Sequence, residues 1–303
     1  MSFTRNTGLA IKTEIAFTER IKNVYAARGA CIYATKMLLL PNRQEKESGS
    51  GNIKNNFNKQ KRNKKKNKTI GPWTPGNNTY PIKIGDRDCE VLISDESGKI
   101  NINKITDETK VNFNKFLTSL KIEELTSEIV TDSILDWIDA DDLHHANGAE
   151  KDYYSALPEP YEPNNAPFES IEELILVKGV TPEIFELLRK RLTIYGTDKI
   201  NINFATHETL MYVPKMTKEI AAAIIKLRGK RGKIKQLDKL KDIFAHFGIL
   251  GSDFQDILKY ITIYDSNYLT IKSISYSDKI QSSYTFVVRK GGDNCRILAT
   301  YAE

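Results

Sequence analysis

The densest group of side chains that could do chemistry is acidic and lies near the middle of the chain. Six carboxylates occur within 17 residues: Asp136, Asp139, Asp141, Asp142, Glu150 and Asp152. Calcium prefers oxygen ligands and accepts flexible loop geometry. The helix predicted over 129–138 would end at Asp139, where negative charge is unfavourable because the helix dipole is already negative there. The residues alone leave two alternatives open, a hard-cation site or a solvated acidic loop.

Catalytic motifs are weak in this sequence. Asp139-x-Asp141 imitates the first two ligands of an EF-hand loop, but no glycine stands at the sixth position. The chain has no Gly-x-Ser-x-Gly, no phosphate-binding Gly-x-x-x-x-Gly-Lys-Ser/Thr and no His-Glu-x-x-His. His144 and His145 stand beside the acidic group, but adjacent side chains point in different directions. We therefore expect a protein that is not an enzyme.

Three short segments, at 176–180, 213–217 and 247–249, resemble the turns of helix-hairpin-helix units. DNA-binding versions use a Gly-apolar-Gly turn, which lets backbone amides approach phosphate. Here one turn reads Gly179-Val180-Thr181 and another reads Lys215-Met216-Thr217, so one or both glycines are missing. This pattern predicts that the helix packing is kept while the DNA contact is absent. A DNA-binding helix-hairpin-helix module with a basic arm is the alternative function.

Composition indicates a globular protein of about two domains with one basic segment. The chain has 303 residues, 40% of them hydrophobic, and a net charge of +6. Residues 41–68 alone hold ten basic and two acidic residues, a net charge of +8, so the rest of the chain carries −2. The surrounding stretch 41–80 is rich in Lys, Asn, Gly and Ser and predicts a linker. It could be a patch for nucleic acid or another anionic surface, but a solvated loop is favoured.

The elements that must position the acidic group follow from apolar periodicity. Apolar residues spaced three or four apart predict a long helix over 3–40, ended by Pro41. Alternating patterns predict strands at 88–93 and 268–276 and a hairpin from 280 to 301, while 104–264 is helical almost throughout. Lys-Ile-Asn-Ile-Asn occurs at 99–103 and again at 199–203, each time before a helix. We interpret both copies as structural strand–turn–helix joints.

Membrane and redox signals are few. No stretch approaches the ~18 apolar residues needed to span a membrane, and charged residues interrupt the start of the chain. This is consistent with a cytosolic protein or with a chain whose leader is missing. The three cysteines, Cys31, Cys89 and Cys295, exclude a disulfide scaffold, and the four histidines make a His-rich metal site improbable.

Several linked motifs resemble the minor pseudopilin K family of type II secretion systems, also called the general secretion pathway protein K family. SDESGKININ at 94–103 and ILDWIDADD at 134–142 are similar to its signatures. The resemblance continues in the same order through further segments at 148–154, 165–168, 172–174, 177–180 and 201–205. The resemblance covers residues from about 90 to 300, and the N-terminal helix matches the family less closely.

The resemblance implies an α+β fold in which a pilin-like N-terminal helix lies on an antiparallel sheet. A large all-α domain would be inserted between the first and later strands. The expected divisions are the helix at 1–40, the linker at 41–80, the sheet at 81–103 and 265–303, and the inserted helical domain at 104–264.

The resemblance also implies a function and partners. It places the protein at the tip of the periplasmic pseudopilus, with minor pseudopilins I and J and contact with exported substrates, and without nucleic acid. It implies calcium on the acidic loop, through Asp139, Asp141, Asp142 and Glu150, with Asp136 and Asp152 as further carboxylates. The family has a prepilin leader and a transmembrane segment, so we expect this sequence to be the soluble part of an inner-membrane-anchored protein. In an oxidising periplasm Cys89 and Cys295, both in predicted strands, could pair.

Overall fold

A computed structural model describes residues 2–40, 72–76, 78–277 and 280–302. The chain divides into two compact units, which are considered separately. The sheet unit comprises residues 1–94 and 269–303, and the helical unit comprises 95–268. The predicted basic linker at 41–80 lies outside the described residues as far as residue 71.

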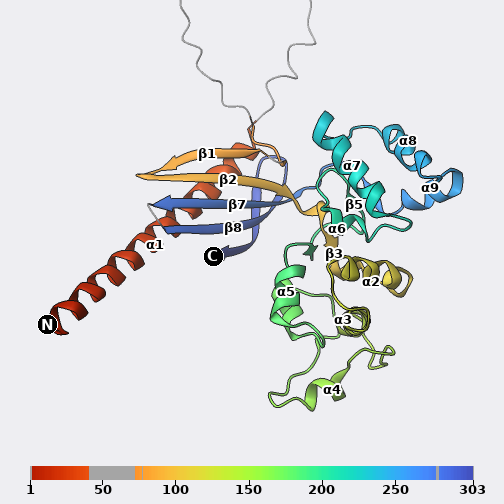
Figure 1. Cartoon of the computed structure of the whole chain (residues 1–303), viewed down its shortest axis with the longest axis horizontal. Helices are drawn as coiled ribbons and strands as arrows, with labels where there is room; N and C mark the ends of the chain where they lie inside the picture. Colours follow the sequence, from red (N-terminus) through yellow and green to blue (C-terminus); the bar gives the residue numbers. More distant parts are fainter. Residues whose placement is uncertain (1, 41–71, 77, 278–279, 303) are drawn as a thin grey trace, which may run out of the picture. The chain divides into compact units, whose positions relative to one another are not determined.

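The sheet unit consists of one long helix and five strands (Figure 1). The strands are hydrogen-bonded in the order β1-β2-β7-β8-β9. β1 pairs with β2, and β8 with β9, in antiparallel register. The bounds are α1 (Ser2–Leu38), β1 (Thr79–Ile84), β2 (Arg87–Asp95), β7 (Tyr268–Ser277), β8 (Ile280–Lys290) and β9 (Cys295–Ala302).

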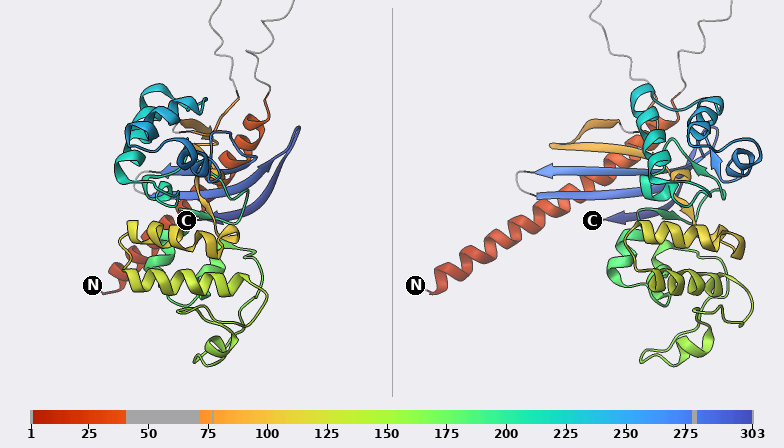
Figure 2. Two further views of the ribbon diagram at one scale, coloured as in Figure 1. Left: turned by 90° about the vertical axis from the view of Figure 1, so that its right-hand side faces the viewer. Right: turned by 45° about the vertical axis from the view of Figure 1, so that its right-hand side comes forward.

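Helix α1 lies along one face of this sheet, as Figures 1 and 2 both show. Its buried residues recur four apart, at Ala26, Ala30, Ala34 and Leu38, so mostly small side chains face the strands. Opposite them, β2 buries alternate residues, as a half-buried strand should. The predicted pilin-like arrangement, in which the C-terminal hairpin shares a sheet with the strand before the insertion, is confirmed.

Two expectations for the sheet were wrong. The sequence predicts one strand before the insertion, but β1 precedes β2, and Gly85 joins them with φ +62. Strand β1 therefore occupies the end of the segment predicted as linker. The possible Cys89–Cys295 disulfide is also excluded, because both cysteines are free. They lie on β2 and β9, with two strands between them, which separates them by about 14 Å.

The helical unit begins with a turn of 3-10 helix and contains two tandem halves. The elements of the first half are η2 (Glu96–Gly98), β3 (Ile100–Asn101), η3 (Ile102–Lys104), η4 (Asp107–Thr109), α2 (Lys110–Ser119), α3 (Glu124–Ile138), α4 (Lys151–Ser155), η5 (Ile171–Leu176), α5 (Pro182–Leu188) and β4 (Leu192–Thr193). Those of the second half are β5 (Ile200–Asn201), α6 (His207–Leu210), α7 (Lys218–Arg231), α8 (Asp238–His246), α9 (Gly251–Ile257) and β6 (Ile261–Thr262).

Each half opens with one copy of the Lys-Ile-Asn-Ile-Asn repeat and closes with a Thr-Ile-Tyr segment. In the first half β3 pairs in parallel with β4, and in the second half β5 pairs in parallel with β6. The unit is therefore mainly but not wholly helical. The predicted boundary at residue 103 differs from the observed one because Ile100–Asn101 pairs inside the helical unit and not with the five-stranded sheet.

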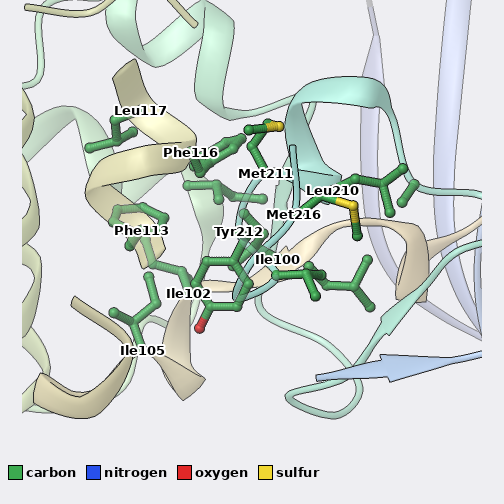
Figure 3. Packing of buried hydrophobic residues seen from close by; sticks show 14 of the residues in the cluster. Ile100, Ile102, Ile105, Phe113, Phe116, Leu117, Leu210, Met211, Tyr212 and Met216 are labelled. Atoms are coloured by element: carbon green, nitrogen blue, oxygen red, sulfur yellow. The ribbon is translucent and has the colours of Figure 1, made fainter. Parts of the chain in front are cut away.

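The two halves share one apolar core. Figure 3 shows Phe113 and Phe116 of α2 beside Met211 and Tyr212, which follow α6. Phe113 and Tyr212 make an edge-to-face contact with ring centroids 6.4 Å apart. The turn after α6 is therefore packed against the first half, which bears on the DNA-binding alternative below.

Candidate metal centre

Helix α3 carries two fully buried carboxylates on one face. Asp132 and Asp136 are four residues apart, which places them one above the other on a helix. Asp132 Oδ1 pairs with Lys110 Nζ at 2.5 Å, and its Oδ2 accepts a hydrogen bond from the backbone of Asn147. Asp132 is therefore neutralised by a cation, whereas Asp136 has no lysine or arginine partner among the described residues.

Four of the predicted carboxylates converge at the end of α3. Asp139 caps the helix, and ligand atoms of Asp139, Asp141 and Glu150 all lie within 4.8 Å of one another. Asp136 belongs to an overlapping group with Asp139 and His145, defined by the same distance. Glu150, at the start of α4, is 1% exposed. The fold thus brings together groups that are up to 14 residues apart in the sequence.

Four carboxylate oxygens of this cluster lack protein donors among the described residues. Both carboxylate oxygens of Glu150, Oδ2 of Asp136 and Oδ1 of Asp139 are buried without a hydrogen-bond partner among the described residues. A buried, unpaired carboxylate is costly, since it loses its hydration and gains nothing in return. Several such oxygens facing one another form a donor set that fits a hard divalent cation.

The electrostatics of the ion-free cluster agree with this geometry. Burial, then repulsion from Asp136 and Asp139, raises the pKa of Glu150 to about 7. Burial and the neighbouring Asp141 also raise the pKa of Asp139. A bound cation would reverse both effects, because it favours the ionised carboxylate.

His145 supports Asp136 from the opposite side. Its backbone N–H donates to Asp136 Oδ1 at 3.0 Å, and its Nδ1 contacts the same oxygen. Its Nε2 lies 3.0 Å from Asp107 Oδ1. Burial opposes protonation of His145, but hydrogen bonds to these two aspartates outweigh it and raise its pKa. Adjacency in the sequence predicts that His144 and His145 point in different directions, but the contacts of His145 with Asp136 and Asp107 were not predicted.

The loop over the cluster requires a glycine. A Cβ atom at Gly148 would lie 1.8 Å from Asp136 Oδ2, so no other residue fits without movement of the loop. Lys178 Nζ holds this segment from the other side, donating to the carbonyl oxygens of Asn147 at 3.2 Å and Gly148 at 2.8 Å.

Asp142 and Asp152 are not part of the central group. Asp142 is exposed and accepts a hydrogen bond from Asn165 Nδ2 at 3.1 Å, although its charge still acts on Glu150. The Asp152 side chain is 74% exposed and pairs with His144 Nε2 at 2.9 Å. The spacing of the sequence could have identified Glu150, and not Asp152, as the better candidate ligand. Glu150 stands at position twelve counted from Asp139, where an EF-hand loop has its glutamate.

The turn between α6 and α7 lacks the glycines of a DNA-binding hairpin. Val213 and Met216 are fully buried, whereas Lys215 and Thr217 on either side of Met216 are exposed. Lys115 Nζ of α2 donates to the carbonyl oxygen of Met216 at 2.5 Å. At the start of α7, Thr217 caps the helix, and Lys218 and Glu219 place charges of both signs in its first turn. The turn therefore packs through its apolar residues and has no pair of glycines that would let the backbone approach a phosphate closely.

Comparison with known proteins agrees with this structure. Residues 98–197 match the family profile "Type II secretion system (T2SS), protein K". A protein of that name from Pectobacterium carotovorum is 29% identical over 179 residues. The chain is therefore similar in sequence to the type II secretion system protein K family. Residues 196–247 also match a helix-hairpin-helix motif, and this range includes the turn between α6 and α7.

Further relatives extend the match to this family, here called the K family. A type II secretion system protein K from Pseudomonas aeruginosa is 25% identical over 228 residues, covering 72% of this chain. One from Aeromonas hydrophila is 29% identical over 128 residues, covering 40% of this chain. The chain spans 54% of the Pectobacterium protein, 66% of the Pseudomonas protein and 39% of the Aeromonas protein.

A solved K-family structure has the same fold. A chain in the crystal structure of the GspK-GspI-GspJ complex from the enterotoxigenic Escherichia coli Type 2 Secretion System superposes with a TM-score of 0.66. The match covers 97% of this chain and 99% of that chain, at 15% sequence identity. The long helix, sheet and inserted helical unit are therefore common to both proteins.

Proposed function

We propose that this protein is a structural minor pseudopilin at the tip of the type II secretion pseudopilus. There it contributes to pseudopilus assembly and protein export. The observation that carries the proposal is the K-family profile match over the first half of the helical unit, where the metal centre lies. The likeness to a chain of the GspK-GspI-GspJ complex supports minor pseudopilins of the I and J types as partners. The protein acts by assembly and not by catalysis. It would contact exported proteins at the same tip.

The proposed location is the periplasm, with the full-length protein anchored in the inner membrane. Similarity to the K family supports this location. Within the described residues, no helix combines the length and apolar character required to cross a membrane.

The proposed ion is calcium, held by Asp136, Asp139, Asp141 and Glu150. The unpartnered buried oxygens of Asp136, Asp139 and Glu150, with the exposed Asp141 beside them, support an oxygen-seeking cation. The loop between Asp139 and Glu150 supports calcium over the more rigid magnesium. When bound, the ion would neutralise the repelling carboxylates and stabilise the loop. Asp142 contributes charge nearby, whereas Asp152 lies outside the central group and pairs with His144.

Assembly can be tested by mixing the protein with I- and J-type minor pseudopilins from the same organism. We expect a ternary complex of one copy each in native mass spectrometry and co-elution in size-exclusion chromatography. Failure to form any complex with cognate partners would contradict the assembly proposal, whatever the result with calcium.

Ion binding can be tested separately by titration calorimetry of the chelator-treated protein. We expect saturable calcium binding that Glu150→Gln weakens about a hundredfold, because it removes a charged ligand from a site that needs several. Glu159→Gln is the matched control, since Glu159 is exposed and lies outside the cluster. Equal affinities in the two variants would show that Glu150 is not a ligand.

A further inference from the structure

The second half of the helical unit carries a concentration of positive charge. Residues 226–241 contain eight basic residues and one acidic residue. Some of these cations are used within the fold. Arg228 donates to the carbonyl oxygen of Ile202 at 2.6 Å, and Lys233 pairs with Asp265 at 2.6 Å. Among the described side chains, the remaining lysines of this stretch show no such contact within the fold.

Part of this charge surrounds a groove between α7 and α8, the α7–α8 groove, with a volume of about 400 Å³. Helix α7 contributes Lys226 and Lys230 and helix α8 contributes Lys239, all three exposed. None of them has an ion pair within the part of the chain that the structure describes. One carboxylate, Asp242, also lines the groove. Three ammonium groups around one concavity repel each other and attract an anion.

The base of the groove is apolar. Ala223 and Leu227 lie four apart on one face of α7, and Ile243 faces them from α8. Leu227 and Ile243 are partly buried against the core, so this surface is fixed by the packing beneath it. A bare anion would gain nothing from these side chains, whereas an apolar side chain next to an acidic one would use both features.

We propose that the α7–α8 groove is a docking site for an acidic segment of a partner protein. One apolar side chain of that segment would occupy the base, and carboxylates beside it would contact Lys226, Lys230 and Lys239. The inference rests on the charge and shape of this groove alone, and so it does not depend on the proposed pseudopilin function.

Nucleic acid is a poorer occupant for two reasons. No aromatic side chain lines the groove, so unpaired bases have no stacking platform. The nearby hairpin turn, Lys215-Met216-Thr217, lacks both glycines of a DNA-binding unit, and Glu219 places a negative charge in the first turn of α7. Nucleic acid therefore serves as the competing outcome in the test.

The test uses the full chain and a short fluorescein-labelled peptide made of Glu, Asp and Leu, followed by fluorescence anisotropy. We expect saturable binding that the double variant Lys226→Glu/Lys239→Glu weakens about tenfold or more, because it reverses one charge on each side of the groove. Lys235→Glu/Lys241→Glu is the matched control. It makes the same change in net charge at exposed lysines that do not line the groove, and we expect less than about threefold loss.

Two further arms test the apolar base. A peptide with Ser in place of Leu should bind at least about fivefold more weakly at the same charge. Ala223→Gln should weaken the Leu-containing peptide without any change of charge, since it fills the groove.

Three results would overturn the proposal. The first is an equal loss of peptide affinity in both double variants, which would indicate a general attraction of the peptide to the basic surface. The second is tighter binding of a single-stranded oligonucleotide of equal charge. The third is no saturable binding of the peptide at low salt.

Discussion

The two halves of the helical unit are built on the same frame but carry opposite charge. Residues 95–196 hold 21 acidic and ten basic residues, whereas residues 197–265 hold eight acidic and twelve basic residues. In both halves a two-residue parallel strand pair brings the repeat beside the closing Thr-Ile-Tyr segment. The frame therefore occurs twice within the chain, and the helices that it supports carry an acidic cluster in one half and the basic α7–α8 groove in the other.

The asparagines of the repeat show what the frame requires. Asn101 Oδ1 accepts from the backbone of Asn103 at 3.1 Å, and Asn201 Oδ1 accepts from that of Asn203 at 3.0 Å. Their Nδ2 groups donate to the closing segment, at Gly196 O and Tyr264 O respectively. One side chain thus joins the start and the end of each half. This shared role accounts for the presence of the same repeat in both halves, although the helices between its two ends differ.

The largest difference between the halves should appear when calcium is removed. Chelation should lower the melting temperature by about 10 °C, because an ion present at a thousand times its dissociation constant stabilises by about 4 kcal/mol. Differential scanning calorimetry with and without chelator measures this effect. Restoring excess calcium should restore the curve, and an unchanged melting curve would count against an ion in the acidic half.

Glycines in the two halves should respond in opposite directions. Gly148→Ala should destabilise the calcium-loaded protein by about 3 kcal/mol, since the new Cβ would overlap Asp136 Oδ2. Gly229→Ala lies in α7 with open space around it and should stabilise by about 0.5–1 kcal/mol. Urea denaturation of both variants tests the contrast, and equal effects would contradict the geometry of the acidic loop.

The shared frame predicts matched losses in the two halves. Asn101→Ala and Asn201→Ala should each cost about 2 kcal/mol, because each removes two side-chain-to-backbone hydrogen bonds made by a buried asparagine. Chemical denaturation gives the values, and Asn164→Ala, at an exposed position, is the control. A large loss in only one half would show that the repeat has lost its role in the other.

Calcium affinity should depend on pH through Glu150. The pKa of Glu150 in the ion-free protein is about 7, above its ordinary value of 4.5. Protonated Glu150 therefore favours folding at low pH, and this contribution is lost as the pH rises through 7, where calcium can replace the proton. Affinity should fall about tenfold from pH 8 to pH 6. Calorimetric titrations at both pH values measure the change. A constant affinity would show that Glu150 is not a calcium ligand.

The smallest effect is expected at Asp152. Because its side chain is exposed and pairs with His144, Asp152→Asn should change calcium affinity less than about twofold. The same titration gives this value. A loss as large as that of Glu150→Gln would mean that the loop closes further on the ion than the structure indicates.

Much of the architecture could be predicted from local signals. Alternation predicted β7, β8 and β9, and the repeat predicted β3 and β5, since burial of one face leaves a pattern along the chain. Strand β1 was missed although Tyr80, Ile82 and Ile84 alternate with exposed residues, because Pro81 interrupts it and is typical of an edge position. The parallel partners β4 and β6 could not be predicted, since a two-residue strand has no period.

By itself, the sequence determined that acidic residues gather after α3, that the chain resembles the K family, and that one frame occurs twice. These properties depend on residue type and spacing, which are local. Only the tertiary structure decided that Glu150 is buried beside Asp139 while Asp152 faces solvent, and that His145 holds Asp136. The reason is physical: the same carboxylate is a ligand or a solvated charge depending on what the fold places around it.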